Sequence, residues 1–157
     1  MIVRAGVLSD THIRVADTAF CKRVAQIFDG GDVIIHAGDL TESGILTAFA
    51  GKTVYAVHGN CCSAVTRATL SERLLFKLGN FTIGLAHGNG RKNIEDSLWM
   101  DFPEADCIVY GHTHRAVCHR EGSDPGILFL NPGTFKSGSY AILEAGETLS
   151  ARLFQIG

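Results

Sequence analysis

The sequence lacks the features that define several protein classes. It has no run of eighteen apolar residues, so we expect no membrane-spanning helix. Proline is rare, with 3 of 157 residues, and the 46% of apolar residues exclude a disordered or low-complexity chain. The 14 lysines and arginines do not exceed the 16 aspartates and glutamates, which argues against an extended nucleic-acid surface. We therefore expect one globular domain over residues 1–157.

Two further absences bear on location. No signal peptide is expected, because Arg4 and Asp10 interrupt the apolar segment that one would need. The five cysteines are odd in number and form no C-x-x-C pair, which favours a reducing compartment over a disulfide framework or a zinc knuckle. We therefore expect a cytoplasmic protein. The sequence leaves open whether it forms a homo-oligomer. We interpret three of the cysteines as small buried side chains: Cys21, Cys107 and Cys118.

The first third of the chain alternates strand and helix patterns. Apolar residues from Val3 to Val7 predict a strand that stops at Ser9, and residues 33–35 and 53–57 predict two more. Thr18 is expected to cap a helix with the apolar face Phe20, Val24, Ile27 and Phe28. A short helix is expected over residues 41–49.

The rest of the chain is mostly strand in pattern. Residues 74–78 and 81–86 predict a hairpin that turns at Gly79 and Asn80, and one helix is expected over residues 93–100. Further strands are expected over residues 107–110, 117–120, 127–130, 140–143 and 149–154. With no linker between the halves, we expect an α/β fold of two sheets packed into one core with helices outside.

Polar side chains that can bind metal recur where the predicted strands end. In an open α/β sheet, the loops after parallel strands meet at one edge, so these distant residues can converge. The seven are Asp10, His12, Asp39, Asn60, His87, His112 and His114. This mixed oxygen and nitrogen set suits Mn²⁺, Fe²⁺, Zn²⁺ or Mg²⁺, and seven ligands suit two ions better than one.

The order of these motifs resembles the signature of the calcineurin-like metallophosphoesterase superfamily. The resemblance rests on Asp10-Thr11-His12, Gly38-Asp39, Gly59-Asn60, His87-Gly88 and Gly111-His112-Thr113-His114. The segment Asn131-Pro132-Gly133-Thr134 is similar to a turn of its small bacterial and archaeal phosphodiesterase branch. The resemblance implies a four-layer α/β/β/α sandwich of two mixed sheets, with a dinuclear metal site at the sheet edges.

The resemblance also implies a role for each residue. Asp10, His12 and His114 are similar to the ligands of one ion, while Asn60, His87 and His112 are similar to those of the other, and Asp39 would bridge the two. A bridging hydroxide would attack phosphorus, with the Asn60 amide neutralising charge on the phosphoryl oxygens. We expect two divalent ions, Mn²⁺ first, with Mg²⁺, Fe²⁺, Zn²⁺ or Ni²⁺ as alternatives.

Three positions depart from the family pattern. Cys61 stands where many members have the histidine proposed as general acid, and Cys62 replaces an acidic residue that orients it. Nearby metal ions should depress the pKa of the Cys61 thiol and make it a poor acid; alternatively, Cys61 packs beneath the site and water or substrate supplies the proton. Asn89 replaces a second histidine, either to donate to phosphate or to favour the turn.

The sequence therefore predicts a metal-dependent phosphoesterase that acts on a small or nucleotide-like phosphate ester, with diesters favoured over monoesters. Asn60, Cys61 and His87 are the residues expected in catalysis. The alternative is a non-catalytic scaffold, because the retromer scaffold subunit resembles this branch and works by binding partners. The complete set of ligand types favours the enzyme.

Overall fold

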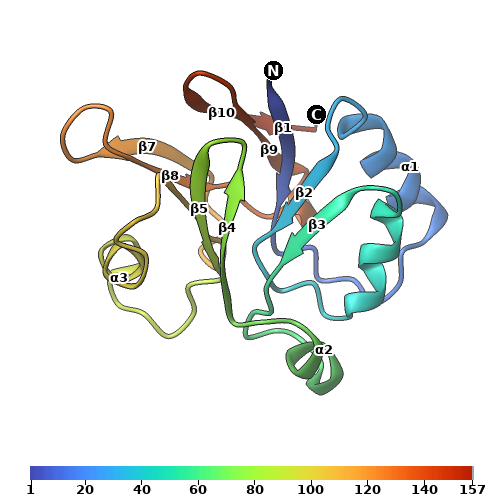
Figure 1. Ribbon diagram of the computed structural model, residues 1–157. Helices are drawn as coiled ribbons and strands as arrows, with labels where there is room; N and C mark the ends of the chain where they lie inside the picture. Colours follow the sequence, from blue (N-terminus) through green and yellow to red (C-terminus); the bar gives the residue numbers. More distant parts are fainter. Residues whose placement is uncertain (157) are drawn as a thin grey trace.

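A computed structural model describes residues 1–156 of the chain, and its strands form two five-stranded mixed sheets (Figure 1). The first sheet has the order β10-β9-β1-β2-β3, with β1 (Val3–Leu8), β2 (Val33–His36) and β3 (Thr53–Ala56) parallel. The other two strands, β9 (Ser139–Ala145) and β10 (Leu149–Gln155), are antiparallel additions at one side. The last strands therefore return to pair with the first.

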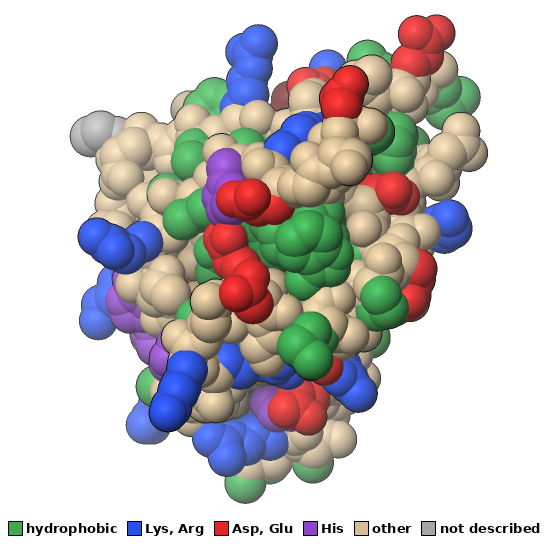
Figure 2. Space-filling view, turned by 90° about the vertical axis from the view of Figure 1, so that its left-hand side faces the viewer, with side chains coloured by type: hydrophobic (Ala, Val, Ile, Leu, Met, Phe, Trp, Pro, Cys, Tyr) green, Lys and Arg blue, Asp and Glu red, His purple; other side chains and the backbone are tan. Residues whose placement is uncertain are grey.

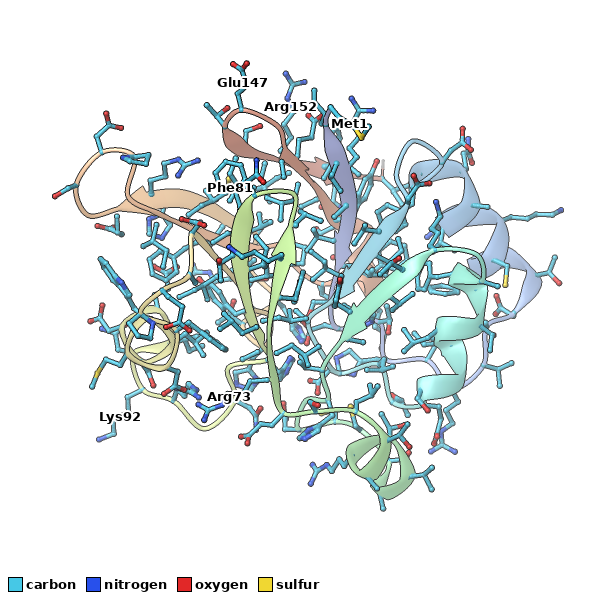
Figure 3. The ribbon with its side chains drawn as sticks, in the orientation of Figure 1. Met1, Arg73, Phe81, Lys92, Glu147 and Arg152 are labelled. Carbon is cyan, nitrogen blue, oxygen red and sulfur yellow. The ribbon has the colours of Figure 1, made fainter. Side chains whose placement is uncertain are left out.

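The second sheet has the order β4-β5-β6-β8-β7. Its strands are β4 (Arg73–Leu78), β5 (Phe81–Ala86), β6 (Cys107–Val109), β7 (Val117–Glu121) and β8 (Ile127–Asn131). The hairpin of β4 and β5 has the register Leu78 to Phe81, with the turn at Gly79 and Asn80 as expected. Figure 3 labels Arg73 at one end of this sheet and Phe81 at the other, and β5 finishes beside Arg73.

Alternating side chains build three apolar layers from these sheets. Inward residues such as Val7, Ile35 and Leu130 pack between the two sheets. The outer face of the first sheet packs against α1 (Thr18–Ile27) and the 3₁₀ helix η1 (Ser43–Phe49). The outer face of the second sheet packs against α3 (Ile94–Asp101). The expected α/β/β/α sandwich is confirmed, because each sheet is apolar on both faces and needs a cover on each.

Several local expectations differ from the structure. Asp17, not Thr18, caps α1: its Oδ1 accepts from the Phe20 N–H at 2.8 Å, and a carboxylate also suits the positive end of a helix. The helix expected over residues 41–49 is a 3₁₀ helix that begins at Ser43. The sequence pattern missed α2 (Ala64–Thr69) and the 3₁₀ turn η2 (Phe135–Ser137), because both are too short to show an apolar period.

Two of the three cysteines expected to be buried are not. Cys118 is exposed rather than buried, because β7 is an edge strand, and Cys21 is half-buried; Cys107 is buried as expected. His119 is half-buried: it stacks on Phe129 and lies 2.7 Å from a Glu95 oxygen. Figure 2 shows this side of the molecule, where hydrophobic side chains gather between acidic ones. None of the helices in residues 1–156 has the length and apolar character needed to cross a membrane.

His36 ties two strand-end loops together from inside the core. The Gly38 N–H donates to its Nδ1 at 3.1 Å, so the neutral ring carries its proton on Nε2, 3.2 Å from Thr11 Oγ1. Full burial, followed by the effect of His87, lowers the pKa of His36 to about 3. The neutral ring thereby fixes the ends of β1 and β2.

Gly6 should be intolerant of a side chain. A Cβ there would lie 2.3 Å from Cδ1 of Phe28, a buried ring between α1 and the first sheet. We expect Gly6→Ala to lower the unfolding free energy by about 1–3 kcal/mol, because the ring must shift in a packed core. Thermal unfolding checks this, with Gly44→Ala as control, since a Cβ there meets no atom of residues 1–156 within 4 Å beyond its chain neighbours. Equal melting temperatures for the two variants would contradict the packing argument.

His36 should make stability depend on pH. Its folded pKa of about 3 lies below the ordinary value of 6.5, so its full contribution is present above pH 6.5 and is lost as the pH falls towards 3. The difference in unfolding free energy between wild type and His36→Gln should be largest near neutral pH. Below that it should shrink by up to about 1.4 kcal/mol per pH unit. Urea unfolding at several pH values measures it, and a difference independent of pH would refute the neutral buried ring.

Candidate metal centre

The loops that follow the parallel strands are joined by backbone hydrogen bonds into one surface. The Asp10 N–H donates to the Gly38 carbonyl at 2.9 Å, and the His12 N–H donates to the Asp39 carbonyl at 3.0 Å. On the second sheet, the Gly111 N–H donates to the His87 carbonyl at 3.1 Å. These bonds tie neighbouring strand-end loops of each sheet to one another.

Left-handed backbone conformations concentrate at these loops. Within residues 1–156, six non-glycine residues have positive φ, and five of them are predicted ligands: Asp10, His12, Asp39, His112 and His114. Such conformations cost free energy for side chains other than glycine and persist only where the surrounding structure holds them. The strain therefore coincides with the residues expected to bind metal.

Two histidine pairs face two carboxylates across the joined loops. His12 and His114 lie edge to face, and their Nε2 atoms are 3.9 and 3.3 Å from Asp10 Oδ1. His87 and His112 form a second edge-to-face pair, in which His87 Nε2 is 3.0 Å from Asp39 Oδ2. In each group, one ligand atom from each histidine and one from the carboxylate lie within 4.8 Å of one another, which is the spacing of a candidate metal site.

Asp39 lies between the two groups. Its Oδ2 is 3.0 Å from His87 Nε2 and 4.0 Å from His12 Nε2, while its Oδ1 accepts from the Cys61 N–H at 2.7 Å. Burial works to raise the pKa of Asp39, but His87, the Cys61 N–H and His12 together lower it to about 2. The carboxylate is thus ionised and faces both histidine pairs.

Asp10 is the more deeply buried carboxylate. Its side chain is fully enclosed, and burial raises its pKa although Ser9 Oγ donates to Oδ2 at 2.7 Å. Burial also works to lower the pKa of His87, but the nearby Asp39 and Asp10 carboxylates outweigh it and raise that pKa. His87 Nδ1 is 2.7 Å from the Ala37 carbonyl, which directs the other ring nitrogen, Nε2, to the centre.

Three buried ligand atoms have unmet bonding capacity. Among residues 1–156, no hydrogen bond of normal geometry reaches Asp10 Oδ1, His12 Nε2 or His87 Nε2, although His87 Nε2 lies 3.0 Å from Asp39 Oδ2. Buried polar atoms are almost always paired, so three such atoms converging on one place call for a missing partner. Divalent cations accept carboxylate and imidazole donors of this kind, and the residues present therefore fit a metal centre.

The Gly59 loop places the remaining predicted residues at the rim. Asn60 is exposed, and its amide Nδ2 donates to Cys61 Sγ at 3.4 Å. Cys61 is exposed, which removes the alternative that it packs beneath the site; partial burial and the Asp39 charge raise the pKa of its thiol. Cys62 Sγ accepts from the Gly59 N–H at 3.2 Å and closes the turn.

The Asn131 turn supports the centre from the C-terminal side, a role that sequence motifs alone did not reveal. Asn131 Nδ2 donates to the Gly111 carbonyl at 3.1 Å and to Thr113 Oγ1 at 3.0 Å, which holds the loop that carries His112 and His114. Thr134 Oγ1 donates to the Asp10 carbonyl at 3.0 Å. The sequence contained the turn motif, but the contacts that the motif makes became visible only in the folded structure.

Comparison with solved structures agrees with this architecture. An archaeal phosphodiesterase superposes with a TM-score of 0.76 at 19% identity, covering 98% of this chain and 100% of that one. The vacuolar protein sorting 29 protein of Cryptosporidium parvum superposes with a TM-score of 0.71 at 18% identity, covering 99% of both chains. At such identities these similarities establish the fold alone, and the two names differ in function.

Sequence comparison is more specific. A probable metallophosphoesterase of Methanothermobacter thermautotrophicus is 33% identical over 162 aligned positions, covering 97% of this chain and 92% of the relative. The model of the calcineurin-like phosphoesterase superfamily domain matches residues 3–148, a span that includes all seven predicted ligands and the Asn131 turn. The chain therefore belongs to the calcineurin-like phosphoesterase superfamily.

Proposed function

We propose that this protein is a metal-dependent phosphodiesterase that hydrolyses a small or nucleotide-like phosphate ester at a centre of two divalent ions. The observation that carries the proposal is the pairing of two histidine pairs with two buried carboxylates, in which three donor atoms lack partners within residues 1–156. Mn²⁺ is the ion that we expect first. Because the cysteines are free, we continue to expect a reducing, cytoplasmic location.

Each residue has a distinct part in the proposed site. Asp10, His12 and His114 would hold one ion, and His87 and His112 the other with Asn60 turned inward, while Asp39 faces both. When bound, two such ions lower the pKa of water and neutralise charge on a phosphate. The Asn60 amide, already at the exposed rim, would donate to a phosphoryl oxygen as charge grows there.

Different observations bear on the choice of a diester substrate and on the choice between an enzyme and a scaffold. The archaeal phosphodiesterase that shares this fold supports a diester substrate, as does the Asn131 turn of the small branch. The vacuolar sorting protein with the same fold supports the alternative of a scaffold that binds partners. The donor atoms without partners support a metal centre, and turnover, not metal binding, separates the enzyme from the scaffold.

Metal content and activity should fall together when Asp39 is changed. We expect wild type to bind two ions per chain and to hydrolyse an activated aryl phosphodiester with Mn²⁺, and a chelator to abolish this. Asp39→Asn should weaken both sites and reduce turnover by orders of magnitude, because Asp39 faces both histidine pairs. His114→Ala should chiefly weaken one site. Metal analysis by mass spectrometry and steady-state kinetics measure these effects.

Asp29→Asn is the matched control for loss of a carboxylate, since Asp29 is exposed after α1 and away from the strand-end loops. It should retain both ions and full activity. One tightly bound ion in fully active protein would overturn the two-ion proposal. Absence of turnover with every divalent metal tested would favour the scaffold.

The rate should depend steeply on the leaving group. Cys61 stands in the family's general-acid position, and a thiol beside bound cations is a poor proton donor. Nitrophenyl esters should therefore react well. Alkyl esters should react up to about 10² to 10⁴ times more slowly than they would with an enzyme that has a working acid. Cys61→His should flatten this dependence and help alkyl esters most. Rates across aryl and alkyl diesters measure both slopes, and equal slopes would contradict the missing acid.

A further inference from the structure

A third group of potential ligands lies between the two histidine pairs. His12, Asp39 and Cys61 each offer one donor atom, and these atoms lie within 4.8 Å of one another. Two ligands held at about 2.0 to 2.3 Å from one ion can be at most about 4.6 Å apart, so small side-chain movements would bring all three onto one ion. The thiol is thus within reach of the proposed centre.

The Gly59 turn brings Cys61 this close to Asp39. The Cys61 N–H donates to Asp39 Oδ1 at 2.7 Å, and a Cβ on Gly59 would lie 2.2 Å from the same oxygen. The Asn60 carbonyl accepts from Arg67 Nη2 at 2.6 Å, which anchors the turn to α2. Only a residue without a side chain at position 59 allows this approach.

Donor atoms near the thiol lack partners of their own, which supports a bound cation here whether or not Cys61 takes part. His12 Nε2 has no hydrogen-bond partner within residues 1–156, and neither has Oδ1 of the fully buried Asp10, 3.9 Å away. The Asp39 carboxylate lies beside them, and its side chain is only 3% exposed. A cation held by His12, Asp10 and Asp39 would therefore lie next to the Cys61 sulfur.

We propose that Cys61 supplies a thiolate ligand to the ion on the His12 side of the centre, an inference that rests on the proposed metal-dependent function. On binding, the sulfur gives an electron pair to the cation and the thiol proton leaves to solvent, so no oxidant is needed. At this one position the thiolate replaces the expectation of Mn²⁺, because sulfur favours Co²⁺, Zn²⁺ or Fe²⁺ over Mg²⁺ and Mn²⁺. The same thiolate has no proton to give to a leaving group.

Cobalt substitution tests this ligand by a signal that does not depend on activity. Metal-free, reduced protein is titrated with Co²⁺, and the near-ultraviolet sulfur-to-cobalt charge-transfer band is recorded with the number of ions bound. Wild type should show the band. Cys61→Ser should lose it and bind Co²⁺ at least about tenfold more weakly, with a smaller change for Mn²⁺.

Cys62→Ser is the matched control, because serine can still accept from the Gly59 N–H and close the turn. It should keep the band. X-ray absorption of the wild-type zinc or cobalt protein gives a second measurement that needs no variant, with a sulfur at about 2.3 Å expected. Two ions bound without sulfur would overturn the thiolate ligand and leave the proposed function standing, whereas failure to bind any ion would overturn both.

Discussion

The burial of two carboxylates at the ends of neighbouring parallel strands is the constraint on which the rest of the structure depends. Asp10 and Asp39 lie at an apolar boundary, where an unpaired charge is costly. Four histidines, the Ser9 hydroxyl and the Cys61 N–H surround them, and three ligand atoms in residues 1–156 are still unpaired. This arrangement thus lowers the stability of the fold, and a divalent cation would complete it.

Strained loops and the apolar sandwich serve this arrangement together. Five of the seven predicted ligands adopt left-handed conformations that only a rigid frame can maintain. That frame is the sheet pair, whose ends are locked by the neutral His36 ring on one side and by Asn131 on the other. The polar network at the edge and the core behind it therefore depend on each other.

Much of this was predictable from the sequence, for identifiable reasons. Strand ends carrying Asp10, Asp39 and His87 follow from apolar runs broken by polar residues, and their order matches the family signature. Contacts that depend on three-dimensional closeness were not predictable, such as the Cys61 thiol beside His12. Edge effects were also hidden, because an apolar pattern around Cys118 does not reveal that β7 has a neighbour on one side alone within the described sheet.

The pairing of β9 with β1 has a consequence for how the protein is made. Asp10 receives its hydrogen bond from Thr134, 124 residues later in the chain, and β1 completes its sheet only when β9 arrives. Contacts of such long sequence separation form late and slow folding, because the intervening chain must be ordered first. During synthesis, Asp10 is therefore present before the residues that hold its loop and its strand, Thr134 and β9, have left the ribosome.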